Sequence, residues 1–290
     1  MPVMYRQVAL IFFAVFLTLP MAEAQYFTGP SVNALGGAGA AARGGSINML
    51  INPAAVALMQ TIEASGQYRN GDLSGGRTES FYGVSIADNT EDVLIAGGLT
   101  YLNGTKKFSG SLESQDQYWN VSLASRLGRL AIGGSAMFLD SAVKGDETYK
   151  QYSGTFGLML LASEQLVFGA VYDSFVNPGS DVPIPVRLTP TSRLGLRWTP
   201  EDFFSVRLDV SRREHENPDR EGAVHFGFES FANNYNIIRF GGRVDDFYKQ
   251  NFVTAGWGFN GPRLKLNYSF EKPLKESNGA MHSVDLLVSF

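Results

Sequence analysis

Apolar and polar residues alternate along much of this chain, most clearly in its C-terminal half. In the stretch RLKLNYSFE, Leu264, Leu266, Tyr268 and Phe270 occupy every second position, and polar or charged residues fill the positions between them. The stretch FSVRLDVSR at residues 204–212 has the same pattern. Successive side chains of a β-strand point to opposite faces, so a period of two residues predicts strands with one apolar and one polar face.

Segments of this kind predict an all-β protein of about fourteen strands. They lie at about residues 60–69, 78–88, 92–103, 116–128, 130–144, 148–163, 166–176, 191–200, 203–214, 222–232, 237–245, 251–260, 263–273 and 282–290. The alternation is weaker in the earlier segments, and residues 148–163 also fit a buried helix. Tight turns alternate with longer connections, which lie at 104–115, 177–190, 214–221 and 274–281.

Alternating short and long connections indicate a transmembrane antiparallel β-barrel, whose two ends face different compartments. The alternative is a soluble β-sandwich, which would have to bury the arginine and lysine side chains of the polar face. Burying an unpaired charge costs several kcal/mol, whereas a hydrated barrel lumen solvates it. The alternation places these charged residues in the lumen: Arg126, Arg193, Arg197, Arg207, Asp209, Glu229, Arg239, Arg243, Lys265 and Asp285.

Aromatic side chains near the predicted strand ends support the barrel, because outer-membrane barrels carry an aromatic girdle at each membrane interface. The group near the longer connections comprises Tyr68, Tyr101, Tyr118, Tyr172 and Tyr248, and the group near the tight turns comprises Trp198, Phe203, Tyr235 and Phe259.

Residues 1–24 have the three parts of a secretory signal peptide. Arg6 supplies a positive charge, residues 8–20 form a short apolar run, and Ala22-Glu23-Ala24 gives the small-x-small pattern of a cleavage site. The run is shorter than the ~20 apolar residues that a membrane-spanning helix needs. We therefore expect export to the outer membrane of a Gram-negative-type bacterium, in contact with outer-membrane lipid.

An even number of strands places both termini of the barrel on the periplasmic side. The chain ends at Phe290, on the apolar face of the last predicted strand. A terminal aromatic residue at this place is typical of the signal by which the barrel-assembly machinery recognises its clients.

The stretch LGGAGAAARGG at residues 35–45 contains Gly37, Gly39 and Ala42 in the G-x-G-x-x-A spacing of a dinucleotide-binding loop. Such a loop lies between a buried strand and the start of the helix that follows it. No strand pattern precedes this stretch, so we expect no nucleotide cofactor.

Small residues also let two backbones pack closely and turn sharply. Asn52 and Pro53 suit the start of a helix, with Asn52 as the N-cap and Pro53 at the first helical position. We therefore predict that residues 25–59 form a plug inside a barrel of residues 60–290.

The Gly/Ala-rich stretch ALGGAGAA at residues 34–41, followed by Asn52-Pro53-Ala54 before the first strand, resembles the long-chain fatty acid transporter (FadL-like) superfamily. The resemblance implies a fourteen-stranded barrel with an N-terminal hatch that passes hydrophobic molecules across the outer membrane. The hatch residues it implies are Gly36, Gly37, Gly39, Asn52, Pro53 and Ala54. This chain is shorter than a typical transporter of the family and lacks most of its long extracellular loops. The same motif occurs in PorV/PorQ-like barrels, which act as docking partners in protein secretion.

The resemblance also implies a kink in the third strand that opens a lateral gap. Gly97 and Gly98 lie in the middle of the third predicted strand, and paired glycines often mark a bulge or a kink. The pairs Gly133-Gly134 and Gly241-Gly242 lie in other strands. The alternative is therefore that these glycines make room for the plug.

The lumen charges leave two interpretations open. They form an ion-pair network that holds the plug to the wall, or they form a basic path for an anionic headgroup such as a carboxylate.

The sequence does not favour an enzyme or a nucleic-acid binder. The net charge is −4, which gives no reason to expect nucleic acid. The histidines are His215, His225 and His282, and none forms the i, i+4 pair of a metal site. We expect no catalytic residue and no metal. Two functions remain: transport of small hydrophobic compounds, or docking of a partner in secretion or surface assembly.

Overall fold

Strands account for most of the structure, a computed structural model in which the helices are short. The strands are β1 (Glu63–Leu73), β2 (Arg77–Asp88), β3 (Ala96–Lys107), β4 (Glu113–Leu127), β5 (Leu130–Val143), β6 (Thr148–Leu161), β7 (Leu166–Asp173), β8 (Thr191–Glu201), β9 (Phe204–Arg213), β10 (Gly222–Phe231), β11 (Asn236–Asp245), β12 (Gln250–Asn260), β13 (Leu264–Pro273) and β14 (Met281–Ser289). The helical elements are α2 (Pro30–Asn33) and the 3-10 turns η1 (Asn48–Leu50), η2 (Pro53–Leu58) and η4 (Ile184–Val186).

The structure describes residues 28–73, 77–90, 94–108, 112–176, 179, 181–201, 203–213, 222–246, 250–275 and 279–290. The predicted signal peptide, residues 1–24, lies outside the described residues, as do residues 25–27 of the predicted plug. Within the described part of the chain, no helix is long and apolar enough to cross a membrane.

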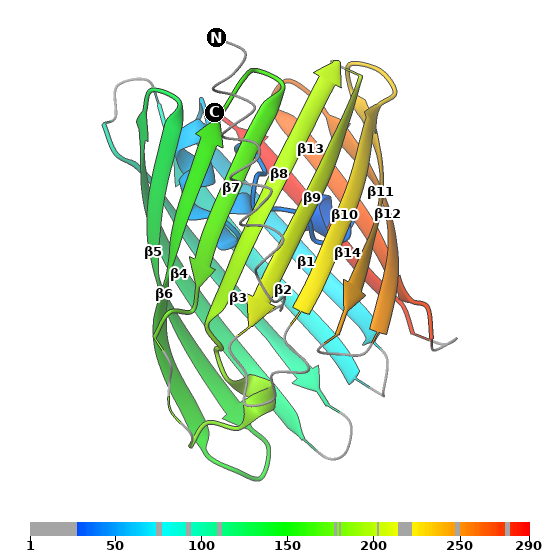
Figure 1. Cartoon of the computed structure of the whole chain (residues 1–290). Helices are drawn as coiled ribbons and strands as arrows, with labels where there is room; N and C mark the ends of the chain where they lie inside the picture. The colour runs from blue at the N-terminus through cyan, green and yellow to red at the C-terminus, as the bar shows by residue number, and fades with distance from the viewer. Residues whose placement is uncertain are drawn as a thin grey trace.

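The fourteen strands form one closed antiparallel barrel (Figure 1). Each strand pairs with its neighbours in the sequence, and β1 pairs with β14 to close the ring, with Glu63 opposite Ser289. Closure satisfies the backbone hydrogen bonds of every strand without an exposed edge. The predicted fold class and strand number are confirmed, and β6 resolves the ambiguous residues 148–163 as a strand.

Two strands extend further than predicted. β1 continues to Leu73 and β3 to Lys107, although Asn70-Gly71 and Asn103-Gly104 are typical turn sequences. Both strands stay paired through these positions, Gly71 opposite Glu79 of β2 and Gly104 opposite Phe81 of β2. The predicted long connection 104–115 is therefore mostly strand.

Burial in the barrel is the reverse of that in a soluble protein. On β2, the outward side chains Tyr82, Val84 and Ile86 are apolar and exposed, at 56%, 60% and 50%. The inward Ser85 and, on β3, Thr100 are buried and hydrogen-bonded to each other at 2.8 Å. An apolar outer surface around a polar interior suits a barrel surrounded by lipid.

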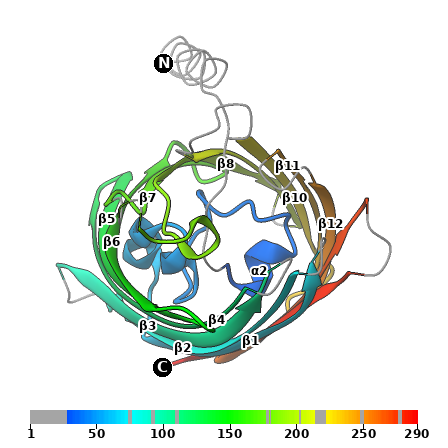
Figure 2. The same ribbon diagram turned by 90° about the horizontal axis from the view of Figure 1, so that it is seen from below.

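The two ends of the barrel differ. β1 begins and β14 ends at one end, called the terminus end below, which also carries the C-terminus and the short turns (Figure 1). At the opposite end, the connection between β7 and β8, residues 174–190, folds over the lumen and carries η4 (Figure 2). The predicted connection 214–221 lies outside the described residues.

Candidate functional site

Residues 28–59, called the inner segment below, lie within the ring of strands (Figure 2). Its first part, with α2, contacts β12, β13 and β14. Its second part, with η1 and η2, packs against β3 to β6. The segment therefore reaches both sides of the lumen.

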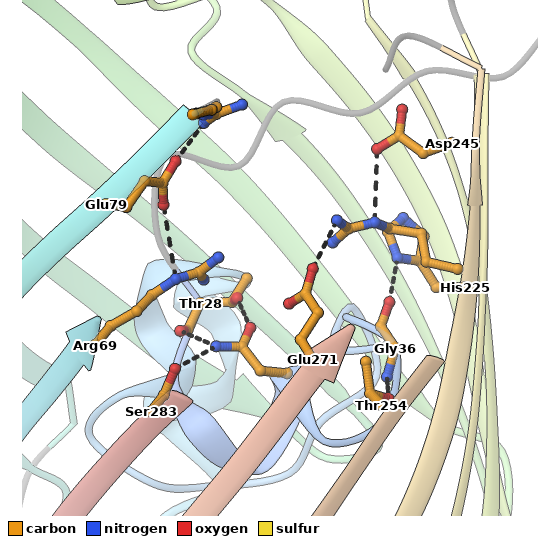
Figure 3. Close-up of polar contacts among 12 residues, drawn as sticks. Thr28, Gly36, Arg69, Glu79, His225, Asp245, Thr254, Glu271 and Ser283 are labelled. Carbon is orange, nitrogen blue, oxygen red and sulfur yellow. Dashed lines mark hydrogen bonds and ion pairs between the residues drawn. The ribbon is translucent and has the colours of Figure 1, made fainter. Parts of the chain in front are cut away.

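Glycines shape the first part of the inner segment. Gly36 and Gly37 have φ angles of +67° and +90°, in the left-handed region that favours glycine. The N–H of Gly36 donates to Oγ1 of Thr254 at 2.9 Å, and the Thr254 hydroxyl donates to the carbonyl oxygen of Ala34 at 3.0 Å. Figure 3 shows Gly36 between Thr254 and His225, whose Nδ1 lies 2.8 Å from the Gly36 carbonyl oxygen. One turn of the segment is thus fixed to β10 and β12.

Asn52 fixes the second part. Its Oδ1 accepts from the N–H of Ala54 at 3.1 Å, which caps η2, and Pro53 occupies the first position of that turn. Its Nδ2 donates to the carbonyl oxygens of Ala40 at 2.7 Å and of Leu158 at 3.1 Å. The fully buried Asn52 therefore joins both parts of the segment to β6.

Glycines also line the inner wall where the inner segment touches it. A methyl group on Gly133 would overlap the backbone of Pro53 and Ala54, and one on Gly241 would overlap the backbone of Leu35 and Gly36. We call the inward glycines that meet the segment the glycine belt; they are Gly98, Gly133, Gly157, Gly169, Gly195, Gly227, Gly241 and Gly256. The belt lets the backbone of the segment lie directly against the wall.

The belt explains the glycine pair predicted as a kink. Gly97 and Gly98 lie near the start of β3, which stays paired residue by residue with β2 and β4 through both positions. A methyl group on Gly98 would overlap the sulfur of Met49. Gly98 therefore makes room for the inner segment, whereas a methyl group on Gly97 would meet only Leu123 and Ser122 of β4. The strand keeps its regular pairing at both positions of the predicted kink.

Charged side chains of the wall bind the backbone of the inner segment. Oδ2 of Asp209 accepts hydrogen bonds from the N–H groups of Gly39 and Ala40, each at 2.8 Å. Nη1 of Arg193 donates to the carbonyl oxygen of Gly37 at 2.9 Å and lies 3.7 Å from Oδ2 of Asp209. The carboxylate thus satisfies amide groups of the segment in the lumen, where they have no strand partner.

A second group of predicted lumen charges forms a chain along the wall. Glu229 accepts from Nε of Arg239 at 2.7 Å and lies 3.3 Å from Nη2 of Arg207. Nη1 of Arg239 donates to Oδ1 of Asn267 at 2.9 Å, and Nδ2 of Asn267 donates to Oδ1 of Asp285 at 2.8 Å. This chain crosses β9, β10, β11, β13 and β14.

Two further predicted cations pair with carboxylates that the sequence did not single out. Nη2 of Arg243 lies 2.9 Å from Oε1 of Glu271. Nζ of Lys265 lies 2.8 Å from Oε2 of Glu63, whose Oε1 accepts from the N–H of Ser46 in the inner segment at 2.6 Å.

The last two predicted charges differ from the others. Arg126 has inward parity but lies exposed at the end of β4, where its Nε donates to the Gly128 carbonyl oxygen at 2.9 Å. Arg197 faces inward on β8, and its Nε is buried without a hydrogen-bond partner.

Sequence reasoning missed an ion-pair group on β1 to β4. Glu79 pairs with Arg69 at 3.6 Å and with Arg77, and Nζ of Lys106 lies 3.7 Å from Oδ2 of Asp116 (Figure 3 shows Arg69 and Glu79). The earlier strands alternate less cleanly, so their inward face was not assigned. Tyr118 belongs to this inward face too, and not to the predicted aromatic girdle, because its side chain is 5% exposed.

One side of the lumen is apolar. We call this cluster the inner apolar patch; it comprises Phe81, Leu102, Tyr118, Met137 and Leu139 of the wall with Leu50 of the inner segment and Leu188 of the β7–β8 connection. The connection is held there by Gln151, whose Nε2 donates to the Val186 carbonyl oxygen and whose Oε1 accepts from the Leu188 N–H, both at 2.8 Å. The patch therefore lies between the inner segment and the β7–β8 connection.

Comparison with known proteins gives matches among solved structures. No protein-family model matches the chain, and no curated protein matches it. The CymD monoaromatic hydrocarbon channel matches with a TM-score of 0.74 at 13% identity, over 93% of this chain and 99% of that chain. The Pseudomonas putida toluene transporter TodX matches with a TM-score of 0.64 at 12% identity, over 94% of this chain and 99% of that chain.

A Pseudomonas aeruginosa FadL homologue matches with a TM-score of 0.66 at 12% identity, over 94% of this chain and 100% of that chain. At these identities the likeness shows a shared fold. The resemblance to FadL-like barrels that the sequence predicted is confirmed at that level.

Proposed function

We propose that this chain is a gated barrel that moves small hydrophobic compounds across the outer membrane. The inner apolar patch is the observation that carries the proposal. An apolar wall does not stabilise a polar solute. The transfer of a hydrophobic compound from water to such a wall is favourable by roughly 25 cal/mol for each Å² of apolar surface that leaves water. The patch is the part of the lumen best suited to hold such a compound.

The fold supports the same class of cargo by analogy. A monoaromatic hydrocarbon channel and a toluene transporter are built on this barrel. A shared fold does not fix a function, so the analogy only adds to the argument from the patch. The matched structures give no support to the docking-partner alternative.

The apolar outer surface supports an outer-membrane location. We further propose that the terminus end faces the periplasm. Phe290 is 74% exposed there, and its N–H donates to the Ile62 carbonyl oxygen at 2.9 Å, which holds the last residue beside β1. This placement leaves its ring accessible to the assembly machinery.

We propose that the inner segment is a plug. It lies on one side of the inner apolar patch and contributes Leu50 to it, while the β7–β8 connection contributes Leu188 on the other side. A compound that binds to the patch therefore touches both elements. Each hydrogen bond between the segment and the wall contributes only about 1 kcal/mol net, so a bound compound can displace part of the segment without unfolding the barrel.

The test is transport by the full chain reconstituted in liposomes. We expect the wild-type protein to speed the equilibration of a neutral monoaromatic hydrocarbon. Leu102→Gln places a polar amide in the inner apolar patch, where burial without a partner costs about 1–3 kcal/mol, and it should slow this equilibration. Leu99→Gln is the matched control, because it makes the same change on the outward face of β3.

The outcome that counts against the proposal is equal transport by wild-type and Leu102→Gln barrels that insert in equal amounts. Absence of any hydrocarbon transport by the wild-type chain also contradicts it.

A further inference from the structure

Gln67 of β1 carries a buried amide at the edge of the inner apolar patch. Its side chain is 5% exposed and points inward, whereas the next residue, Tyr68, points outward and is 47% exposed. Among the residues that the structure describes, neither Nε2 nor Oε1 of Gln67 has a hydrogen-bond partner. Buried polar groups are nearly always paired, because leaving one unpaired costs free energy. Two unpaired atoms on one buried amide therefore indicate a partner that the protein itself does not provide.

The inward polar side chains on either side of Gln67 along β1 are paired. The hydroxyl of Ser65 accepts from the hydroxyl of Ser46, in the inner segment, at 3.0 Å. Arg69 forms an ion pair with Glu79 at 3.6 Å (Figure 3). Gln67 is thus the first inward position of β1 beyond its contacts with the inner segment.

The strand register places Gln67 in one row with the inner apolar patch. Gly83 of β2 lies directly opposite Gln67, and Leu102 of β3 lies directly opposite Gly83. The next residue in this row is Tyr118 of β4. A methyl group on Gly83 would lie 2.2 Å from Cδ2 of Leu102, so the Leu102 side chain covers this glycine. The amide of Gln67 therefore borders the apolar surface that we propose holds the cargo.

We propose that Gln67 binds the hydroxyl group of a neutral, otherwise hydrophobic compound held by the inner apolar patch. The amide has both a donor and an acceptor atom, and a hydroxyl group can also donate and accept. A carbonyl group would pair with Nε2 and leave Oε1 without a donor, and a hydrocarbon pairs with neither atom. The inference rests on the proposed transport function and narrows its cargo to alcohols and phenols.

The charges near Gln67 favour a neutral group over an anion. Asp285 of β14 is the direct partner of Gln67 across the strands, and its Oδ1 accepts from Asn267 at 2.8 Å. Two carboxyl groups at one site cannot both ionise without a cost in free energy. On the other side, the guanidinium group of Arg69 is already engaged by Glu79. A carboxylate at Gln67 would therefore meet an acidic neighbour, whereas a hydroxyl group brings no charge.

The experiment compares ethylbenzene, benzyl alcohol and benzoate, which share a benzene ring and differ in the group attached to it. Binding to the purified full chain in detergent is measured by equilibrium dialysis, with protein-free micelles as the blank. The hydroxyl preference is the Kd of ethylbenzene divided by the Kd of benzyl alcohol. Gln67→Met replaces the amide by an apolar side chain of similar length. It should lower this preference about tenfold, which corresponds to about one net hydrogen bond, and benzoate should bind the wild type more weakly than benzyl alcohol.

Two further variants separate binding from folding. Gln117→Met makes the same change on the outward face of β4 and should keep the wild-type preference. Gln67→Asn keeps the amide but withdraws it by one methylene group, so it should lower the preference as Gln67→Met does. An amide that only stabilises the wall predicts a lower melting temperature for Gln67→Met and an unchanged preference.

The inference is overturned if both neutral probes bind and the two Gln67 variants keep the wild-type preference. Benzoate binding as tight as that of benzyl alcohol also overturns it, because the site would then accept an anion. In both cases the binding of ethylbenzene leaves the proposed transport function standing. If neither ethylbenzene nor benzyl alcohol binds the wild type, the transport function fails, and this inference fails with it.

Discussion

Single glycines decide how the inner segment fits into the barrel. Gly133 and Gly134 are neighbours on β5, and only Gly133 faces the segment. A methyl group at Gly134 would meet no atom nearer than the Thr155 carbonyl oxygen at 3.9 Å, whereas one at Gly133 would overlap the backbone of Pro53 and Ala54. Backbone atoms cannot rotate out of the way as a side chain can.

We therefore expect Gly133→Ala to loosen the inner segment and Gly134→Ala to leave it unchanged. Overpacking of this kind typically costs ~1–3 kcal/mol, and the barrel should still form because its own backbone pairing is intact. The readouts are protease cleavage within residues 28–59 and leakage of a small polar solute from liposomes. Identical cleavage and leakage for the two variants would contradict the assigned role of the glycine belt.

At the residue scale, sequence reasoning found the charges of the later strands but not their partners. Asp209 and Arg193 were placed in the lumen from their alternation, and they do contact the inner segment. His225 has the same inward parity as Glu229 on β10, a signal that could have identified it. Its partner Gly36 is 189 residues away in the sequence, and no local pattern predicts such a contact.

Elements differ in how firmly they are held. Gln151 is 1% exposed and makes two hydrogen bonds to the backbone of the β7–β8 connection, and Ser153 makes two more through the backbone of Val176. Without this side chain, the buried carbonyl oxygen of Val186 and the N–H of Leu188 lose their partner.

Gln151→Met should therefore release the β7–β8 connection from the lumen. Each buried backbone group left unpaired costs about 1–3 kcal/mol, which exceeds what one apolar contact restores. We expect faster protease cleavage within residues 174–190 than in the wild type. Gln165→Met is the control, since Gln165 is exposed at a terminus-end turn and donates only to the Pro200 carbonyl oxygen at 2.9 Å. Similar cleavage rates for both variants would show that Gln151 does not hold the connection.

At the element scale, alternation predicted the number and order of strands because a wall with lipid on one side and water on the other enforces a period of two. It failed where the inward face holds glycine or an apolar side chain. On β3, the inward positions Gly98 and Leu102 are not polar, so the apolar and polar faces of the strand cannot be told apart from the sequence. Gly98 makes room for Met49, and Leu102 belongs to the inner apolar patch. The C-terminal ends of β1 and β3 lie further along the chain than predicted, at Leu73 and Lys107, because the alternation of the earlier strands is weaker.

The whole molecule has two unlike ends, and this difference allows a test of its orientation. The terminus end carries short turns, and the opposite end carries the β7–β8 connection. A tag within residues 177–190 should be labelled by an impermeant reagent on intact cells, and a tag at Glu201-Asp202 should not. Permeabilised cells give the total amount of each tag. Equal labelling of both tags on intact cells would reject the proposed orientation.

The pairing of β1 with β14 also sets the order in which this protein can be assembled. The ring closes only when β14 pairs with β1, and the inner segment precedes every strand of the barrel in the sequence. Its Asn33 donates to the hydroxyl of Ser283 on β14 at 3.4 Å, and Gly36 binds Thr254 on β12. These contacts join residues more than 200 positions apart, so they add long loop closures to the folding pathway. The inner segment can therefore make these contacts only after β12 and β14 have joined the barrel.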